Sequence, residues 1–257
     1  MAYRCCTCTI HFTMNRTLII GDIHGGLKAL KQITERAKII PTDTLIFLGD
    51  YVDGWSESAQ VINYLIELNK QQTCIFIKGN HDVMCEEWLR TGKQDRTWLM
   101  HGGIATIESY ATISNATRLA HLNFLEQMKF FHVDVQNRLF IHAGFTSMHG
   151  PEQEFYSTNF IWDRTLWEMA IIMDKRVKKD SVLFPRRLKL YEEIYIGHTP
   201  TINYGVSTPM QGCNVWNIDT GAAFYGSLTI MDVDTKQFWQ SDPVKDLYPE
   251  EMGRNKL

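Results

Sequence analysis

The 257-residue sequence has no long apolar run, no cysteine framework and no large excess of charge of one sign. No run approaches the ~18 apolar residues that are needed to span a bilayer, so the sequence offers no membrane segment. The 26 basic and 29 acidic residues leave a formal net charge of -3, which gives no global electrostatic case for binding nucleic acid. Internal repeats and low-complexity linkers are also absent, which favours a single domain.

The six cysteines show no pattern of pairing. Cys74 lies in an apolar run typical of a strand, and Cys85 lies in a stretch with helical periodicity. Disulfides form in oxidising compartments, so unpaired cysteines fit a reducing one. We therefore expect a cytoplasmic protein.

Residues 1–13 differ from the rest of the sequence. They contain Cys-Cys-Thr-Cys at positions 5–8 and His11, but no strand or helix period and no secretory pattern. Their spacing is too compressed for the usual paired-ligand zinc knuckle. We expect a disordered tail or a mis-assigned start, with Met14 as the natural first residue.

From residue 17 apolar runs alternate with helical patterns, which predicts an α/β fold. The expected strands lie at residues 17–21, 44–49, 73–78, 139–142, 194–197, 215–219, 227–232 and 237–240. The expected helices lie at residues 27–39, 58–68, 82–90, 103–110, 116–129 and, in a basic stretch, 165–191. This organisation predicts one domain over residues 14–257 with helical insertions near 100–130 and 165–191.

Five short segments follow apolar runs and carry Asp, Asn or His. They are Gly-Asp-Ile-His-Gly at 21–25, Gly-Asp-Tyr-Val-Asp-Gly at 49–54, Gly-Asn-His-Asp at 79–82, Phe-Ile-His-Ala-Gly at 140–144 and Gly-His-Thr-Pro at 197–200. Such side chains bind hard or borderline divalent metals. Strand ends in an open α/β sheet face a common crevice, so the five segments predict a two-metal site. Such sites usually hydrolyse phosphate esters or anhydrides.

The spacing of the ligand residues suggests how two metals would be shared. A histidine two residues after an aspartate returns to the same side of an extended chain, so Asp22 and His24 suit one metal. Asp50 has two carboxylate oxygens and could bridge both metals. The second metal would be completed by Asn80, His142 and His198.

The five segments resemble those of the calcineurin-like metallophosphoesterases. More narrowly they resemble the phosphoprotein phosphatase branch, which includes bacterial serine/threonine protein phosphatases and symmetrical diadenosine tetraphosphatases. The similarity runs from residue 17 to 234 and includes Asp-Thr-Gly-Ala at 219–222, and Trp98 followed by Gly102, Gly103 and Thr106. This resemblance implies a four-layer sandwich, in which two mixed β-sheets are flanked by helices, forming a single catalytic domain.

The resemblance also implies a mechanism. Two divalent metal ions, Mn or Fe with Zn as a further candidate, would activate a bridging hydroxide for in-line attack on phosphorus. His81 would protonate the leaving alkoxide, and Asp53 would hold its imidazole in position. The alternative for His81 is a purely structural histidine.

One departure from the family pattern concerns phosphate binding. The family has Asp-Arg-Gly where this sequence has Asp53, Gly54 and Trp55, so an arginine that grips phosphate is missing. Arg164 is the best remaining candidate, with an ion pair to Asp163 or a neighbouring glutamate, Glu168, as the alternative. Tyr51 and Trp55 could stack on a base or a phosphotyrosine ring or could pack the loop, and the sequence does not decide between these roles. His101 could face the pocket, but the sequence favours a helix-cap or solvent role for it.

These residues predict a phosphatase acting on phosphoserine, phosphothreonine or phosphotyrosine proteins or on small phosphate esters. The alternative is a symmetrical dinucleoside tetraphosphate hydrolase. A more distant one is a non-catalytic phosphate-binding module, which is disfavoured because every expected ligand is present. The sequence does not decide the oligomeric state, and we expect neither nucleic acid nor membrane as a partner.

Overall fold

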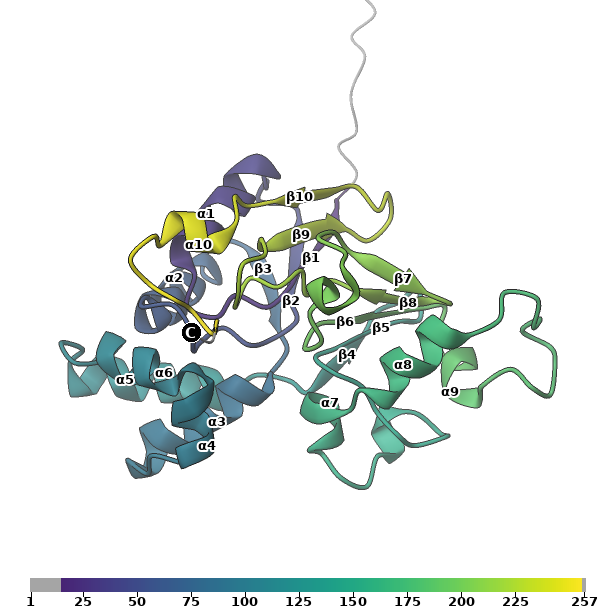
Figure 1. The fold of residues 1–257 in the computed structure, drawn as a ribbon, viewed down its shortest axis with the longest axis horizontal. Coiled ribbons are helices and arrows are strands. Elements are labelled where there is room, and N and C mark those ends of the chain that lie inside the picture. Colours follow the sequence, from purple (N-terminus) through teal and green to yellow (C-terminus); the bar gives the residue numbers. More distant parts are fainter. Residues whose placement is uncertain (1–14, 256–257) are drawn as a thin grey trace, which may run out of the picture.

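The computed structural model describes residues 15–255, so the expectations for residues 1–13 and Met14 lie outside the described part of the chain. The described residues form two five-stranded mixed sheets that pack face to face, with helices on both outer faces (Figure 1). This arrangement confirms the predicted four-layer sandwich.

The first sheet has the strand order β10-β9-β1-β2-β3. Its strands β1, β2 and β3 run parallel, and β9 and β10 join them in antiparallel pairs. Three parallel strands in sequence place the residues after each strand at one edge of the sheet. The strands are β1 Thr17–Ile20, β2 Thr44–Phe47, β3 Thr73–Phe76, β9 Thr229–Asp232 and β10 Phe238–Gln240.

The second sheet has the order β4-β5-β6-β8-β7. Its central strands β5, β6 and β8 are parallel, while β4 and β7 pair antiparallel at the two edges. The strands are β4 Phe131–Val133, β5 Arg138–Ile141, β6 Glu193–Ile196, β7 Met210–Gly212 and β8 Val215–Asn217. The edge strands β4 and β7 have no counterpart among the strands expected from the sequence.

The core follows the alternation of side chains along each strand. Ile19 of β1 and Ile46 of β2 pack between the sheets against Phe140 and Tyr195 of the second sheet, whose rings stack at 5.1 Å. Their strand neighbours, such as Leu18, point to the opposite face and pack against helices. A run buried on both faces reads as continuously apolar, which is why these strands were visible in the sequence.

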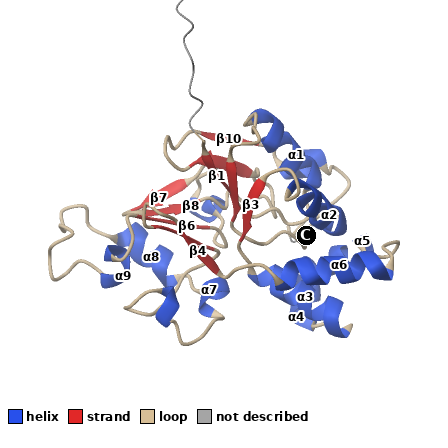
Figure 2. Cartoon of the chain, turned by 180° about the vertical axis from the view of Figure 1, so that it is seen from behind, coloured by secondary structure: helices blue, strands red, loops and turns tan. Residues whose placement is uncertain are grey.

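Helices cover the outer face of each sheet (Figure 2). The helices on the first sheet are α1 Leu27–Arg36, α2 Ser58–Leu68, α3 Asn80–Thr91, α4 Arg96–Trp98, α5 Ile104–Ser109, α6 Asn115–Glu126 and α10 Val244–Leu247. Those on the second are α7 Asn159–Trp162, α8 Thr165–Ile172 and α9 Arg186–Lys189. Within the described part of the chain, no helix has the length and apolar character to cross a membrane.

The continuous helical stretch expected over residues 165–191 is wrong in its middle. Helix α8 ends at Ile172, and residues 173–185 form turns and irregular chain before α9. The side chain of Asp174 accepts the backbone N–H of Arg176 at 2.9 Å, a local turn that competes with helix. The basic residues there are therefore exposed on a loop and not on a helix face.

Candidate metal centre and active site

The ends of five parallel strands bring the predicted ligands together. Residues that follow β1, β2 and β3 meet residues that follow β5 and β6, because the two sheets present these ends on the same side. All six expected ligands are buried, with exposures of at most 8%. They are Asp22, His24, Asp50, Asn80, His142 and His198.

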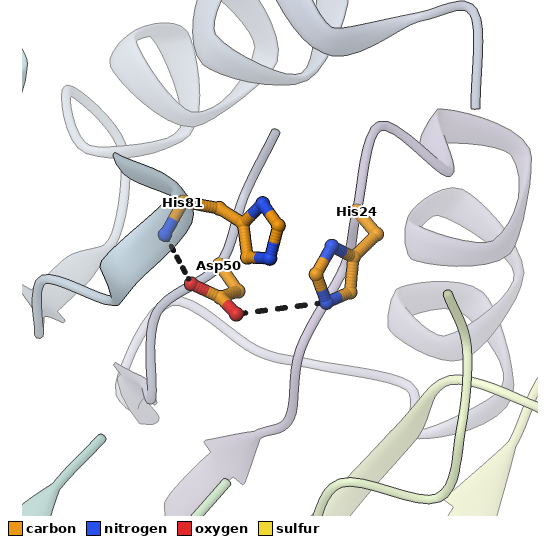
Figure 3. Close-up of side chains that lie close together, drawn as sticks. All are labelled: His24, Asp50 and His81. Carbon is orange, nitrogen blue, oxygen red and sulfur yellow. Dashed lines mark hydrogen bonds and ion pairs between the residues drawn. The ribbon is translucent and has the colours of Figure 1, made fainter. Parts of the chain in front are cut away.

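Asp50 lies at the centre of this cluster (Figure 3). Its Oδ2 atom is 3.6 Å from Nε2 of His24 and 3.5 Å from Nε2 of His142. Its Oδ1 atom accepts the backbone N–H of His81 at 3.0 Å. One carboxylate thus faces two separate imidazoles, as a bridge between two cations requires.

A second set of atoms converges on Asn80. Its Oδ1 atom lies 3.2 Å from Nε2 of His142 and 3.0 Å from Nδ1 of His198. Together with Asp50, these two histidines form one of the compact groups of potential metal ligands. The other group joins Asp50 and His24 to His81, and Asp22 approaches it with Oδ2 at 3.9 Å from Nε2 of His24.

Backbone carbonyls fix the orientation of two of these imidazoles. Nδ1 of His24 donates to the carbonyl of Asp53 at 3.1 Å, and Nδ1 of His142 donates to the carbonyl of Leu48 at 2.8 Å. A carbonyl only accepts, so each Nδ1 carries the hydrogen and each Nε2 offers its lone pair to the cluster. This outer support is typical of histidines that bind metal.

Tight backbone geometry accompanies the cluster. A Cβ atom on Gly79 would lie 2.1 Å from Oδ1 of Asp50, and one on Gly197 would lie 2.1 Å from Oδ1 of Asp22. Glycine is therefore required where the chain passes closest to the carboxylates. Four non-glycine residues here also have positive φ angles, the strained geometry that clusters at functional sites. They are His24 (52°), Asp50 (54°), Asp53 (73°) and His198 (66°).

The charges of the cluster call for cations. Burial and the nearby Asp219 raise the pKa of Asp22 well above its usual range. Burial lowers the pKa of His142, but the carboxylate of Asp50 outweighs it and raises the pKa to about 10. The site thus contains several buried carboxylates and stabilises positive charge between them.

Two buried polar atoms of the proposed ligands also indicate that the site fits metal ions. Among the described residues, neither Oδ1 of Asp22 nor Nε2 of His198 has a hydrogen-bond partner. Buried polar atoms without partners are rare and call for an explanation. Mixed carboxylate, amide and imidazole donors suit borderline divalent metals, so the cluster fits a binuclear metal site.

His81 and Asp53 form a hydrogen-bonded pair beside this cluster. Nδ1 of His81 lies 2.6 Å from Oδ2 of Asp53, and both side chains are buried. Asp53 is held in turn by Nε1 of Trp98 at 2.7 Å and by the hydroxyl of Thr106 at 2.6 Å. Because Asp53 engages Nδ1, Nε2 is the ring nitrogen of His81 that this pair leaves open. The packing of Gly103 against Trp98, where a Cβ would come within 2.5 Å of the ring, keeps this support in place.

A cavity of about 200 Å³ opens onto the cluster. Asp50, Asn80 and His81 form part of its wall, and Trp162 and Arg164 line it from the chain after β5. His101 also lines this cavity, although the sequence favoured a capping or solvent role for it.

Among the described residues, Arg164 does not form the alternative ion pair with Asp163 or Glu168. The carboxylate of Asp163 accepts hydrogen bonds from the backbone of Thr165 at 3.0 Å and of Leu166 at 3.2 Å instead. Within residues 15–255, the Arg164 side chain has no hydrogen bond or ion pair, and the side chain is exposed. Its guanidinium is therefore available to a ligand in the cavity.

Tyr51 and Trp55 pack the loop and do not reach the cavity. Both are fully buried, and Tyr51 donates its hydroxyl to the carbonyl of Ile77 at 2.7 Å. The ring of Trp55 stacks on Tyr248 at 5.4 Å. Neither side chain can stack on a bound ligand in this conformation.

Sequence reasoning gave no site role to three residues that the structure places here. Asp82 accepts the backbone N–H groups of Gly79 and Asp50 at 2.7 and 2.8 Å, which joins two of the ligand loops. Asp219 is buried near Asp22, and burial raises its pKa to about 6. Asp82 ends the Gly-Asn-His-Asp segment and Asp219 begins the Asp-Thr-Gly-Ala segment, so both lie in motifs that could have marked them as site residues. Arg254 lines the cavity from the C-terminal segment, where no motif marked it.

The comparison with protein families agrees with this geometry. The model for calcineurin-like phosphoesterases matches residues 15–205. The chain belongs to this family. Its relatives by sequence similarity include the asymmetrical bis(5'-nucleosyl)-tetraphosphatase PrpE of Bacillus cereus (strain AH187), which is 27% identical over 82% of this chain and 87% of that protein. Serine/threonine-protein phosphatase 1 of Salmonella typhimurium is 25% identical over 82% of this chain and 89% of that protein.

Solved structures show the same fold for this calcineurin-like phosphoesterase. A protein serine/threonine phosphatase from Saccharomyces cerevisiae superposes with a TM-score of 0.60 at 12% identity, covering 89% of this chain and 80% of that one. A putative diadenosine tetraphosphatase gives a TM-score of 0.59 at 16% identity, covering 89% and 94%. The sandwich is thus shared with these solved structures. The family match and the similarity to the serine/threonine-protein phosphatase of Salmonella typhimurium support a metal-dependent phosphatase.

Proposed function

We propose that this chain hydrolyses phosphate monoesters, either on phosphoserine, phosphothreonine or phosphotyrosine side chains or on small esters, by in-line attack of water. The observation that carries the proposal is His81, which lines the cavity beside the metal-ligand cluster and whose Nδ1 lies 2.6 Å from Oδ2 of the buried Asp53. A positioned acid beside clustered ligands is what transfer of a phosphoryl group to water requires.

The cluster divides into two ligand sets that share one carboxylate. Two divalent cations, when bound, would lower the pKa of water and neutralise the phosphate oxygens. We assign Mn or Fe, with Zn as a further candidate, because the donors mix oxygen and imidazole nitrogen. One set is Asp22, His24 and Asp50, and the other is Asp50, Asn80, His142 and His198.

The remaining residues act on protons and on charge. Asp53 accepts the Nδ1 hydrogen of His81, so the imidazole presents Nε2 to the cavity and, when protonated, donates from it to the leaving alkoxide. Arg164 has no partner among the described residues and lines the same cavity, where its planar guanidinium would bind two phosphate oxygens.

A second candidate substrate is a dinucleoside tetraphosphate. Trp162 is 45% exposed at the cavity, with its ring edge-on to His198 at 5.7 Å, and it offers a platform on which a base could stack. The related PrpE proteins carry a tetraphosphatase name. However, the cavity of about 200 Å³ lies below the roughly 300–1,000 Å³ of most ligand pockets, which favours a single phosphoryl group.

The test compares three substrates on one preparation. Metal-stripped protein would be reloaded with Mn²⁺ and given p-nitrophenyl phosphate, a set of phosphopeptides, or diadenosine tetraphosphate. We expect the highest kcat/KM with monoesters. Arg36→Ala serves as a control for preparation, because Arg36 pairs with Asp242 on the exposed surface.

The products distinguish the alternatives. Preference for diadenosine tetraphosphate would replace the monoesterase proposal with a tetraphosphatase, with two ADP indicating symmetrical cleavage and ATP plus AMP asymmetrical cleavage. Turnover of none of the three by Mn²⁺-loaded protein would contradict the proposal and favour a phosphate-binding module.

A further inference from the structure

The loop that departs from the family pattern makes room for the C-terminal segment. Gly54 has a φ of +114°, which side chains rarely adopt, and a Cβ there would lie 3.2 Å from Cγ of Arg254. The absence of a side chain at position 54 therefore leaves space that the stem of Arg254 occupies. In Figure 1 the described segment that follows α10, drawn in yellow, runs beside the start of α2.

The neighbouring Trp55 forms the seat for this segment. A Cβ on Gly253 would come within 2.6 Å of the Trp55 ring, so the chain crosses the indole where only glycine fits. Nε1 of Trp55 donates to the carbonyl of Ala222 at 2.7 Å, and the backbone N–H of Arg254 donates to the next carbonyl, that of Ala223, at 2.8 Å. The indole and the terminal segment are thus fixed to the same turn.

Polar contacts fasten the segment to the loop that carries Asp53. The carboxylate of Glu251 accepts both the backbone N–H of Ser56 at 2.9 Å and its hydroxyl at 2.6 Å. The hydroxyl of Tyr248 donates to the carboxylate of Glu57. Three successive loop residues, Trp55, Ser56 and Glu57, thus each contact the C-terminal segment. The position of Arg254 is therefore coupled to that of the loop that carries Asp53.

The Arg254 side chain faces the active-site cavity. It lines this cavity together with Asp50, His81 and Arg164. Its guanidinium carbon lies 5.4 Å from the centre of the Phe224 ring, and no ion pair engages it within the described part of the chain.

We propose that Arg254, carried by the C-terminal segment, binds the phosphoryl group in this cavity and supplies the guanidinium for which Gly54 leaves room. The inference rests on the proposed phosphatase function and names a binding residue for it. Arg164 and Arg254 come from chain segments about ninety residues apart, yet they line one cavity. Two planar guanidinium groups can hold separate oxygens of one phosphate and leave the third free.

The test measures binding of inorganic phosphate as well as turnover. Arg254→Met removes the charge and keeps an unbranched apolar stem beside Gly54, and Arg254→Lys keeps the charge without the planar fork. Asn255→Ala, on the same segment, and Arg36→Ala, an exposed cation elsewhere, are the matched controls. For each Mn²⁺-loaded protein, titration calorimetry gives the Kd for phosphate, elemental analysis gives the Mn content, and p-nitrophenyl phosphate gives kcat and KM.

We expect Arg254→Met to weaken phosphate binding and to lower kcat/KM by about 10- to 100-fold, the usual range for a hydrogen bond to a charged group. The Mn content and the melting temperature should stay at the wild-type values, and free guanidinium ion should restore part of the activity. Arg254→Lys should fall between Arg254→Met and wild type, and both controls should match wild type.

A phosphate Kd for Arg254→Met within twofold of wild type, at full Mn content, would overturn the inference while leaving the phosphatase proposal standing. So would a wild-type protein that binds no phosphate. If wild type binds phosphate through Arg254 but hydrolyses none of the substrates, the inference holds and the proposed function fails.

Discussion

His81 is held by two aspartates, one at its ring and one at its backbone. Its Nδ1 atom lies 2.6 Å from Oδ2 of Asp53, and its backbone N–H donates to Oδ1 of Asp50 at 3.0 Å. The first contact sets the orientation of the ring, and the second ties the start of α3 to the centre of the ligand cluster. A histidine held in this way can protonate a leaving group without being a metal ligand itself.

Replacement of His81 should therefore separate proton transfer from metal binding. We expect His81→Asn to retain its Mn, because none of the six proposed ligands is altered. It should slow alkyl phosphates with poor leaving groups by ~10²–10⁴-fold, the usual contribution of a general acid, and p-nitrophenyl phosphate much less. The measurement is kcat/KM against leaving-group pKa for wild type and variant. An equal loss for all leaving groups would argue against His81 as the acid.

The expected bridge makes a different prediction for Asp50. Its Oδ2 atom is within 3.6 Å of an imidazole on each side, so Asp50→Asn removes the negative charge that both ligand sets share. We expect a loss of bound Mn, measured by elemental analysis, together with a loss of turnover. Asp242→Asn, at an exposed carboxylate paired with Arg36, is the matched control and should retain both. Full Mn content with normal turnover in Asp50→Asn would exclude the bridging role.

The sequence predicted the parts of this site that depend on strand ends. Asp22, Asp50 and Asn80 each follow a buried apolar strand, and parallel strands bring such residues together whatever the loops do. The support of Asp53 by Trp98 and Thr106 could not be derived in this way. It depends on how α4 and α5 pack against the sheet, which is a property of the tertiary structure.

The contribution of Arg254 was also beyond sequence reasoning. Its neighbour Gly54 lies two hundred residues earlier, and only the folded chain places its Cγ near that glycine. A similar limit explains the helix wrongly expected over residues 173–185. Its composition suits a helix, but the local turn at Asp174 offers the backbone other partners. Local propensity is a weak guide where such competition exists.

The carboxylate of Asp82 should be important for stability as well as for the site. It accepts three buried backbone N–H groups, from Gly79 at 2.7 Å, Asp50 at 2.8 Å and Tyr51 at 2.9 Å. Asp82→Ala would leave all three without partners, at a cost of about 3 kcal/mol or more in free energy of unfolding. For a chain of this length we expect the melting temperature to fall by roughly 6–12 °C.

Asp82→Asn separates the possible causes of this effect. The amide oxygen can still accept, whereas the NH₂ group cannot, so only part of the network should be lost. We expect an intermediate melting temperature and reduced Mn content, because Asp50 and the Asn80 loop are no longer held together. A melting temperature for Asp82→Ala equal to that of wild type would show that the three N–H groups find other partners.

The buried His121 should make the protein less stable in mild acid. The Tyr110 hydroxyl lies 2.8 Å from its Nδ1, and Nε2 lies 2.9 Å from Oδ1 of Asn63, an arrangement that the neutral ring satisfies on both sides. Burial lowers the pKa of His121 to about 4, against about 6.5 in an unfolded chain. Between these values the unfolded chain binds a proton that the folded protein does not, so stability is lost as the pH falls from about 6.5 to about 4. The full difference corresponds to about 3 kcal/mol of unfolding free energy.

Replacement of His121 tests this pH dependence. We expect His121→Gln to flatten the pH dependence of the unfolding free energy over this range, measured in urea at several pH values. His149→Gln, at an exposed histidine, should leave the slope unchanged. An unchanged slope in His121→Gln would place the acid sensitivity in the carboxylates instead.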